Sequence, residues 1–162
     1  MACFFKKTTL LSLLIATLLI TGCYTSYSVI VQNYKYDQDI GFTIDKVEEG
    51  SNISTGNGSY YAKKGFKFVF LHTTLTNNAN ELKKLDFANF YLLDPKTHTR
   101  YKAEFAMMEG AFNVWGHVNS EIQKNDTKRR KLVFTFPKDE KPEMFSVNDV
   151  VYNIKYSASA NN

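Results

Sequence analysis

Cysteine is nearly absent from this chain of 162 residues. The two cysteines, Cys3 and Cys23, both lie within the first 23 residues. The remainder of the chain has no thiol, which excludes a disulfide, a cysteine nucleophile and a cysteine metal site from the folded body.

Histidine is also scarce, and no recognisable catalytic pattern accompanies it. His72, His98 and His117 are far apart and follow no metal-ligand spacing. No Gly-x-Ser-x-Gly elbow occurs, and the glycines at residues 56–58 lack the strand–turn–helix context of a phosphate loop. The sequence therefore predicts no metal, no cofactor and no enzymatic activity.

Neither sign of charge dominates. The 20 basic and 16 acidic side chains give a net charge of +4, which falls to about +2 without Lys6 and Lys7. Such a weak bias argues against nucleic acid as a partner. The densest charge cluster is Lys128-Arg129-Arg130-Lys131. Lys128, Arg129 and Arg130 are candidates for contact with anionic lipid or cell-wall polymer, and the alternative is a solvated start to a strand.

Long apolar runs are missing. The N-terminal run covers residues 10–20 and includes Ser12 and Thr17, whereas a membrane-spanning helix needs at least about 17 apolar residues. Lys6 and Lys7 precede the run, so residues 1–22 have the charged and apolar regions of a secretory signal.

The run ends in Leu19-Ile20-Thr21-Gly22-Cys23. This string resembles the lipobox of bacterial lipoproteins, in which a small residue and Gly or Ala precede the cysteine. The resemblance implies cleavage between Gly22 and Cys23, a diacylglycerol on the Cys23 sulfur, and acylation of the new amine. The alternative is an ordinary secretory signal followed by a chance cysteine.

An anchor on Cys23 would tether residues 23–162 to the extracytoplasmic side of a membrane, because two or more acyl chains hold a protein stably. Tyr24 stands where an aspartate would signal inner-membrane retention, which favours the outer membrane in a Gram-negative organism. Residues 23–39 are a connector with strand character at residues 28–31. Residues 157–162 are small and polar, typical of a frayed tail.

The remaining residues, 40–156, alternate apolar and polar side chains in short segments. Residues 65–76 are the strongest example: Val69, Leu71 and Leu75 fall on one face, and His72 falls on the other. Residues 51–59 are rich in glycine, serine and asparagine and are predicted to be a loop. Further strands are predicted at residues 40–45, 87–93, 99–105, 130–136, 144–147 and 150–156. We expect an all-β fold, an immunoglobulin-like two-sheet antiparallel β-sandwich.

Three stretches of this body resemble a known family. Residues 65–77 have a glycine leading into an apolar strand that ends in Thr-x-Asn. Residues 90–94 with Tyr101 have a Phe-x-Leu-x-Asp … Tyr pattern, and residues 132–138 are an apolar strand ending in Pro-Lys. Together they resemble the telokin-like, immunoglobulin-like domain of unknown function (DUF4352-like) of many bacterial lipoproteins. Lys124-Asn125-Asp126 replaces the usual Pro-Gly, and Asn and Asp tolerate the same left-handed turn geometry. The family implies no catalytic residues.

Residues 105–122 are apolar without alternating. Met108, Phe112 and Trp115 recur at three- and four-residue steps, the spacing of one helical face. The segment either caps an open end of the sandwich and buries Trp115, or exposes these side chains as a binding surface. We expect the cap.

Three functions remain open. The chain is expected to be a non-catalytic envelope lipoprotein whose sandwich binds an envelope or surface partner. It could instead be a structural or assembly subunit of an envelope or secretion complex. An envelope hydrolase is disfavoured because no catalytic constellation is present.

Overall fold

The computed structural model describes residues 24–55, 58–109 and 120–157. These residues form strands and one short 3₁₀ helix, η1, at Phe87–Asn89. The strands are β1 (Thr25–Ser28), β2 (Asn33–Lys35), β3 (Ile40–Gly50), β4 (Asn52–Thr55), β5 (Gly58–Tyr61), β6 (Phe66–Asn77), β7 (Lys83–Lys84), β8 (Phe90–Leu93), β9 (Arg100–Met108), β10 (Glu121–Ile122), β11 (Thr127–Pro137), β12 (Met144–Val147) and β13 (Val150–Asn153).

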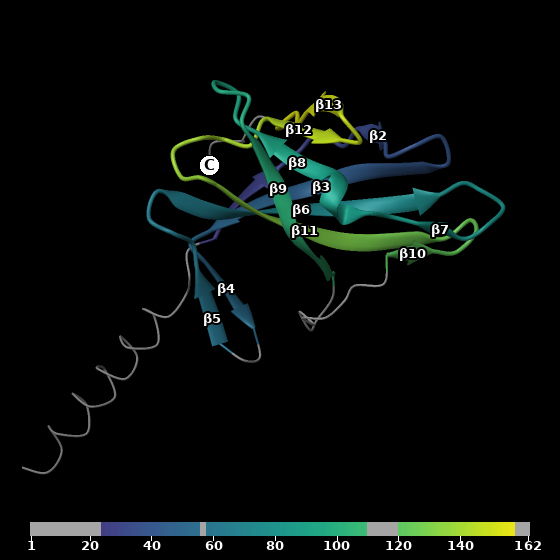
Figure 1. Cartoon of the computed structure of the whole chain (residues 1–162), viewed down its shortest axis with the longest axis horizontal. Coiled ribbons are helices and arrows are strands. Elements are labelled where there is room, and N and C mark those ends of the chain that lie inside the picture. The colour runs from purple at the N-terminus through teal and green to yellow at the C-terminus, as the bar shows by residue number, and fades with distance from the viewer. Residues whose placement is uncertain (1–23, 56–57, 110–119, 158–162) are drawn as a thin grey trace, which may run out of the picture.

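The main sheet is antiparallel and folds over itself into two layers (Figure 1). Its order is β1-β3-β6-β11-β9-β8-β12-β13, with β2 added beside β3. The first layer contains β3, β6 and β11, and the second contains β8, β12 and β13. Strand β9 belongs to both, because its C-terminal half pairs with β11 and its N-terminal half pairs with β8. The predicted two-layer antiparallel β-sandwich is confirmed.

A β-bulge in β9 makes this change of layer possible. Val133 pairs with Phe105, but the next residue, Phe134, pairs with Ala103, which leaves Glu104 as the extra residue. A bulge bends its strand and increases the local twist. Ala103 therefore faces the core between the layers, while Phe105 packs on the opposite side of the sheet.

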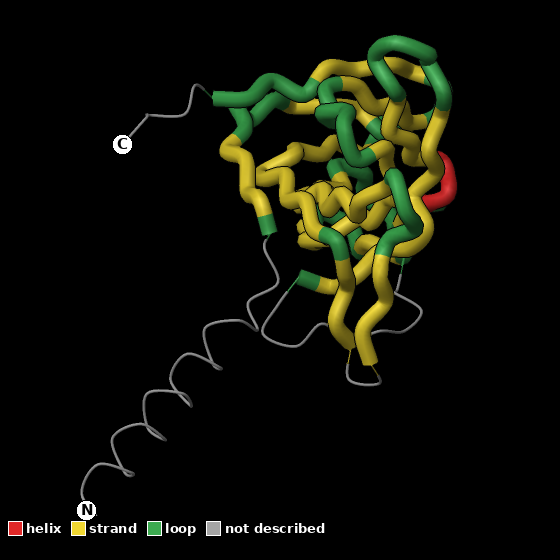
Figure 2. Tube along the Cα trace, turned by 90° about the vertical axis from the view of Figure 1, so that its left-hand side faces the viewer, coloured by secondary structure: helices red, strands yellow, loops and turns green. Residues whose placement is uncertain are grey.

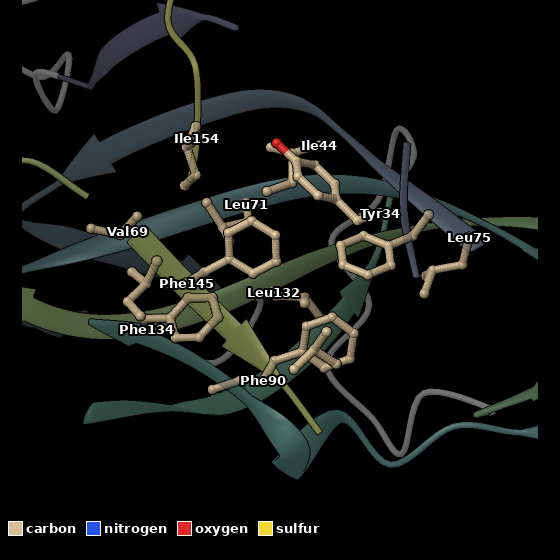
Figure 3. Packing of buried hydrophobic residues seen from close by; sticks show 14 of the residues in the cluster. Tyr34, Ile44, Val69, Leu71, Leu75, Phe90, Leu132, Phe134, Phe145 and Ile154 are labelled. Carbon is tan, nitrogen blue, oxygen red and sulfur yellow. The ribbon is translucent and has the colours of Figure 1, made fainter. Parts of the chain in front are cut away.

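The main core lies between the layers (Figure 3). Leu71 and Leu132 enter it from the first layer, and Phe90 and Phe145 enter from the second. The alternation predicted for residues 65–76 and 130–136 is confirmed. The fully buried side chains include Val69, Leu71, Leu75, Leu132, Phe134 and Phe136.

Turns between strands use residues that accept a positive φ angle. Asn148 and Asp149, at φ 46° and 65°, form the two-residue connection between β12 and β13, as expected for a type I′ hairpin. Asn125 has φ 55° before β11. This is the left-handed geometry expected for the residues that replace Pro-Gly. Strands β8 and β9 also pair as a hairpin, and His98 has φ 56° in the turn between them.

Two segments differ from the sequence expectation. The predicted loop at residues 51–59 is wrong: β4 and β5 pair there as a hairpin, because β pairing satisfies backbone groups whatever the propensity of the side chains. Within residues 23–39, β1 and β2 both pair with β3. The connector therefore contributes strands to the sheet.

The two ends of the sheet also meet. Val29, just after β1, forms an antiparallel bridge with Tyr156. The backbone N–H of Ile30 donates to the Lys155 carbonyl at 2.7 Å, and that of Ser157 donates to the Ser28 carbonyl at 3.1 Å. This seam joins the N-terminal segment to the C-terminal one.

Candidate functional site: an aromatic groove beside a β-hairpin arm

The hairpin of β4 and β5, here called the arm, extends beyond the body of the sandwich (Figures 1 and 2). Ile53 pairs with Tyr60, and Asn52 pairs with Tyr61. Side chains of paired residues share one face of a hairpin. Ile53 is buried and faces the sandwich, so Tyr60 lies on the same face of the arm and Tyr61 lies on the opposite face.

The arm is held against a second apolar cluster, on the outer face of the first layer. Phe68 and Phe70 of β6, Met107 of β9 and Val133 of β11 form this cluster with Ile53. An antiparallel sheet commonly leaves one face to water. Here β6 buries side chains on both faces, which creates an apolar seat for the arm.

A hollow of about 840 Å³ lies between the arm and this outer face; we call it the groove. Its lining includes Tyr60, Tyr61, Phe66, Tyr101, Lys102 and Phe105. Tyr60, Tyr61 and Phe66 are 56%, 73% and 37% exposed. A concave site of this volume with aromatic walls and a few polar groups is typical of ligand-binding sites.

Tyr24 ties the start of the described chain to the arm. Its hydroxyl donates to the Asn52 carbonyl at 2.8 Å, and its ring centroid lies 5.8 Å from that of Phe70. A Cβ on Gly50 would lie 2.6 Å from the Tyr24 ring, so glycine is what allows this close approach. Burial, then the nearby Glu48 carboxylate, raises the pKa of Tyr24.

A row of charged side chains crosses the same outer face beside the groove. The two ring nitrogens of His72 lie 2.7 Å from Glu48 Oε2 and 2.8 Å from Glu109 Oε1. Lys46 Nζ lies 2.5 Å from Glu48 Oε1, and Lys131 Nζ lies 3.8 Å from Oε2. Burial alone would raise the pKa of Glu48, but hydrogen bonds from Lys46 and His72 outweigh it and hold that pKa below its ordinary value.

This row is built for ion pairing. The His72 ring donates to both carboxylates when each of its nitrogens carries hydrogen, so neither nitrogen is open to a substrate. Within the described ranges, no three His, Cys, Asp or Glu side chains are placed to hold a metal ion. Sequence reasoning placed His72 opposite the core, but gave no sign of Glu109, which lies 37 residues away.

The structure divides the predicted basic cluster between two faces of β11. Arg130 is buried on the same inner face as Leu132, which lies two residues further along the strand. Lys131 lies on the outer face, with its Nζ 5.6 Å from the centre of the Phe70 ring. Lys128 pairs with Asp126 at 2.8 Å, and Arg129 is exposed. The candidates Lys128, Arg129 and Arg130 therefore do not form one patch.

Of the predicted aromatic and methionine surface, only Met108 is described. It ends β9 and is 45% exposed. Phe112 and Trp115 lie outside the described residues, as does Cys23. No helix in the described ranges has the length and apolarity that crossing a bilayer requires.

The profile of the family described as Domain of unknown function (DUF4352) matches residues 31–157. The chain belongs to this family. The three stretches that carried the resemblance all lie within the match. A search of curated protein sequences found no match.

Solved structures similar to this DUF4352 domain share its fold at low identity. A conserved hypothetical protein from Bacillus anthracis is 16% identical, with a TM-score of 0.57, covering 85% of this chain and 98% of that one. An uncharacterized β-sandwich protein from Clostridium difficile 630 is 13% identical, with a TM-score of 0.52 and coverages of 83% and 95%. A functionally unknown protein from Listeria monocytogenes EGD-e is 13% identical, with a TM-score of 0.53 and coverages of 84% and 89%.

The groove of this DUF4352 domain was missed by sequence reasoning. Its signal was present in residues 60–66, where aromatic Tyr60, Tyr61 and Phe66 flank the two lysines at positions 63 and 64. No apolar period runs through this stretch, so a search for buried faces passes over it. Exposed aromatic and basic side chains in one short run are themselves a surface signal.

Proposed function

We propose that this DUF4352 protein is a non-catalytic envelope lipoprotein whose β-sandwich is a binding or accessory module at a membrane surface. The observation that carries the proposal is the groove, where Tyr60 and Phe66 stay exposed beside a buried apolar cluster. Exposed aromatic side chains next to a well-packed apolar seat are the groups that dominate binding energy in protein interfaces.

The charged row supports a non-catalytic role. Glu48 and His72 lie on the outer face of the first layer beside the groove, and both are hydrogen-bonded within the domain. A general base must reach a substrate proton, and both ring nitrogens of His72 already lie within hydrogen-bond distance of carboxylates of the domain.

The membrane attachment rests on the lipobox ending at Cys23. Replacing Cys23→Ser should abolish acylation and cleavage at this position, so the signal stays attached and the acyl mass is lost. Mass spectrometry after membrane fractionation measures both the retained signal sequence and the missing acyl groups. Normal processing and membrane retention of the variant would contradict the anchor.

Capture from detergent-solubilised membranes tests the groove. The lipidated wild type should retain a partner that the Tyr60→Ser/Phe66→Ser double variant loses. Val150→Ser is the matched control, since Val150 is 51% exposed on β13 in the second layer. Equal capture by all three proteins would contradict a groove-based function.

The identity of the captured partner separates the two candidate roles. A single protein retained in fixed stoichiometry favours the alternative function, an assembly subunit of an envelope or secretion complex. Capture of a glycan or a surface protein favours a receptor.

A further inference from the structure

The outer face of the arm and the turn that follows it border the groove and are open to solvent, because Tyr61 and Lys63 both line the groove and are exposed. Tyr61 is 73% exposed there, and the chain continues through the exposed Lys63 and Lys64 into a turn in which the Phe66 N–H donates to the Lys63 carbonyl at 2.9 Å. Gly65, at φ 84°, gives this turn the positive φ that it needs. We call Tyr61, Lys63 and Lys64 the arm base.

Lys63 and Lys64 are among the lysines that have no carboxylate partner in the described residues. Within the described ranges, six other lysines lie within 4 Å of a carboxylate: Lys46, Lys67, Lys83, Lys96, Lys128 and Lys131. Two adjacent cations beside an exposed tyrosine therefore present unneutralised charge to whatever lies below the arm.

The membrane tether begins at the same place. Tyr24 follows Cys23 directly, and its hydroxyl binds the carbonyl of Asn52, the residue paired with Tyr61. Successive Cα atoms are about 3.8 Å apart, so an acylated Cys23 would stand within one residue of a side chain fixed to the arm. With no free linker between them, the arm must lie near the lipid that holds the anchor.

We propose that the arm base rests on the anionic lipid surface to which Cys23 is anchored, so that the protein contacts the membrane through its fold as well as its lipid. This inference rests on the proposed anchor. Tyrosine is enriched at membrane interfaces because its ring is apolar and its hydroxyl is polar. Lysines next to an anionic surface add electrostatic attraction.

The contact would fix the orientation of the domain. Strand β6 starts beside the arm base at Phe66 and runs for 12 residues to Asn77, a length of about 35 Å. The turn after Asn77 therefore lies about one strand length from the arm base, while the groove, which Tyr61 and Lys63 also line, opens close to the lipid surface. A partner that binds the groove would therefore bind next to the membrane surface.

A fluorescent label tests this contact in the full lipidated protein. Ser59 shares the outward face of β5 with Tyr61 and is exposed, so Ser59→Cys places an NBD label beside the arm base without removing it. Asn80→Cys, exposed in the turn after β6, is the control position. In vesicles containing phosphatidylglycerol, the Ser59→Cys label should shift to the blue. Headgroup nitroxide lipids should quench it severalfold more than the Asn80→Cys label.

Charge variants show whether lysines make the contact. Lys63→Gln/Lys64→Gln in the Ser59→Cys protein should lose most of the blue shift, as should added salt. Lys84→Gln/Lys124→Gln removes the same charge from exposed lysines near β7 and β10 and should keep it. An equal shift in pure phosphatidylcholine vesicles would overturn the anionic-lipid contact.

Mass spectrometry of the same samples separates this inference from the anchor itself. If the protein is acylated and floats with the vesicles, but the Ser59→Cys label shows no blue shift, the proposed contact of the arm base with lipid is wrong and the proposed anchor on Cys23 is supported. If no acyl group is found, the anchor fails and the contact fails with it. A shift that needs added cell-wall polymer assigns the arm base to that polymer and overturns the lipid proposal.

Discussion

Gly50 decides how the N-terminal segment lies on the domain. A Cβ there would meet Cε1 and Cδ1 of Tyr24 at 2.6 and 2.7 Å, and the ring is the part free to move. Gly50→Ala should therefore displace Tyr24 and lose its contact with Phe70, at a cost of about 0.5–1.5 kcal/mol for the aromatic pair. Nitration of Tyr24, read by mass spectrometry, should become faster.

Gly41→Ala is the matched control for this prediction. The nearest atom to a Cβ on Gly41 is the Tyr34 carbonyl oxygen at 3.6 Å, which is ordinary van der Waals contact. Tyr24 should stay as protected as in the wild type. Protection that survives in Gly50→Ala would mean that the Gly50 contact does not position the tether.

Glu48 makes part of the stability depend on pH. Its pKa in the folded protein lies below its ordinary value of 4.5 because Lys46 and His72 donate to it. The stabilisation is therefore complete above about pH 4.5 and is lost as the pH falls through the lower folded value. Glu48→Gln should lower the unfolding free energy at neutral pH and flatten its decline between about pH 5 and pH 3.

Chemical denaturation across this pH range measures the effect. Glu104→Gln removes one carboxylate from an exposed position in the β9 bulge, and it should leave the neutral-pH stability close to that of the wild type. A Glu48→Gln curve parallel to the wild-type curve would contradict the assigned role of Glu48.

At the scale of elements, the arm should be separable from the sandwich. Ile53 is the side chain that seats the arm in the outer cluster. Ile53→Ala should release the arm locally, so the Ala62 amide, bonded to the Ser51 carbonyl at 2.9 Å, exchanges faster with solvent. Leu71→Ala, in the main core, should instead lower global stability by about 2–5 kcal/mol.

Hydrogen exchange and denaturation together distinguish the two variants. Uniformly faster exchange in Ile53→Ala, with the same loss of global stability as Leu71→Ala, would show that the arm is an integral part of the core. A helical circular dichroism spectrum, or no loss on Leu71→Ala, would contradict the packed β-sandwich itself.

Elements with a regular apolar face were predictable, and elements without one were not. Val69, Leu71 and Leu75 had to share a face because a strand alternates, so β6 could be placed from sequence. The arm could not, because its glycine, serine and asparagine residues carry no alternation. The groove was missed for the same reason: its walls come from the arm and from the second face of the sheet, to which sequence reasoning assigned no packing partner.

Long-range pairing set a second limit. The alternation in residues 130–136 predicted β11, yet nothing in it indicated that the bulge at Glu104 would turn β9 from one layer to the other. Such a bulge depends on register, which packing between distant segments decides. The left-handed Asn125 was predictable because a local side-chain preference sets it.

At the scale of the whole molecule, the seam couples the two ends of the chain. Tyr156 lies at its centre: its hydroxyl donates to the Pro142 carbonyl at 2.5 Å, and its ring packs against Tyr27 at 5.6 Å between centroids. Lys141 Nζ lies 3.8 Å from the centre of the same ring. The C-terminal segment thereby holds β1, the strand that directly follows the tether.

Tyr156→Ala should open this seam, whereas Tyr156→Phe should keep the ring and lose only one hydrogen bond. The alanine variant is expected to lose about 3–5 kcal/mol, as for other large aromatic truncations, and the phenylalanine variant about 0.5–1.5 kcal/mol. Denaturation measures both losses. Proteolysis of the N-terminal segment should accelerate in Tyr156→Ala alone, and equal losses in the two variants would mean that ring packing does not close the seam.

The seam should also fail at high pH. Burial, followed by nearby charges including Glu49, raises the pKa of Tyr156 well above its ordinary value of 10.0. A pKa raised in the folded state gives stability that is complete below about pH 10, and this stability is lost as the pH rises, because the unfolded chain releases the proton first. Between about pH 9 and pH 11, wild-type stability should therefore fall more steeply than that of Tyr156→Phe. Parallel curves would show that this hydroxyl ionises as freely in the folded chain as in the unfolded one, and the seam would then depend on the packing of the Tyr156 ring and on the backbone pairing of Val29 and Tyr156.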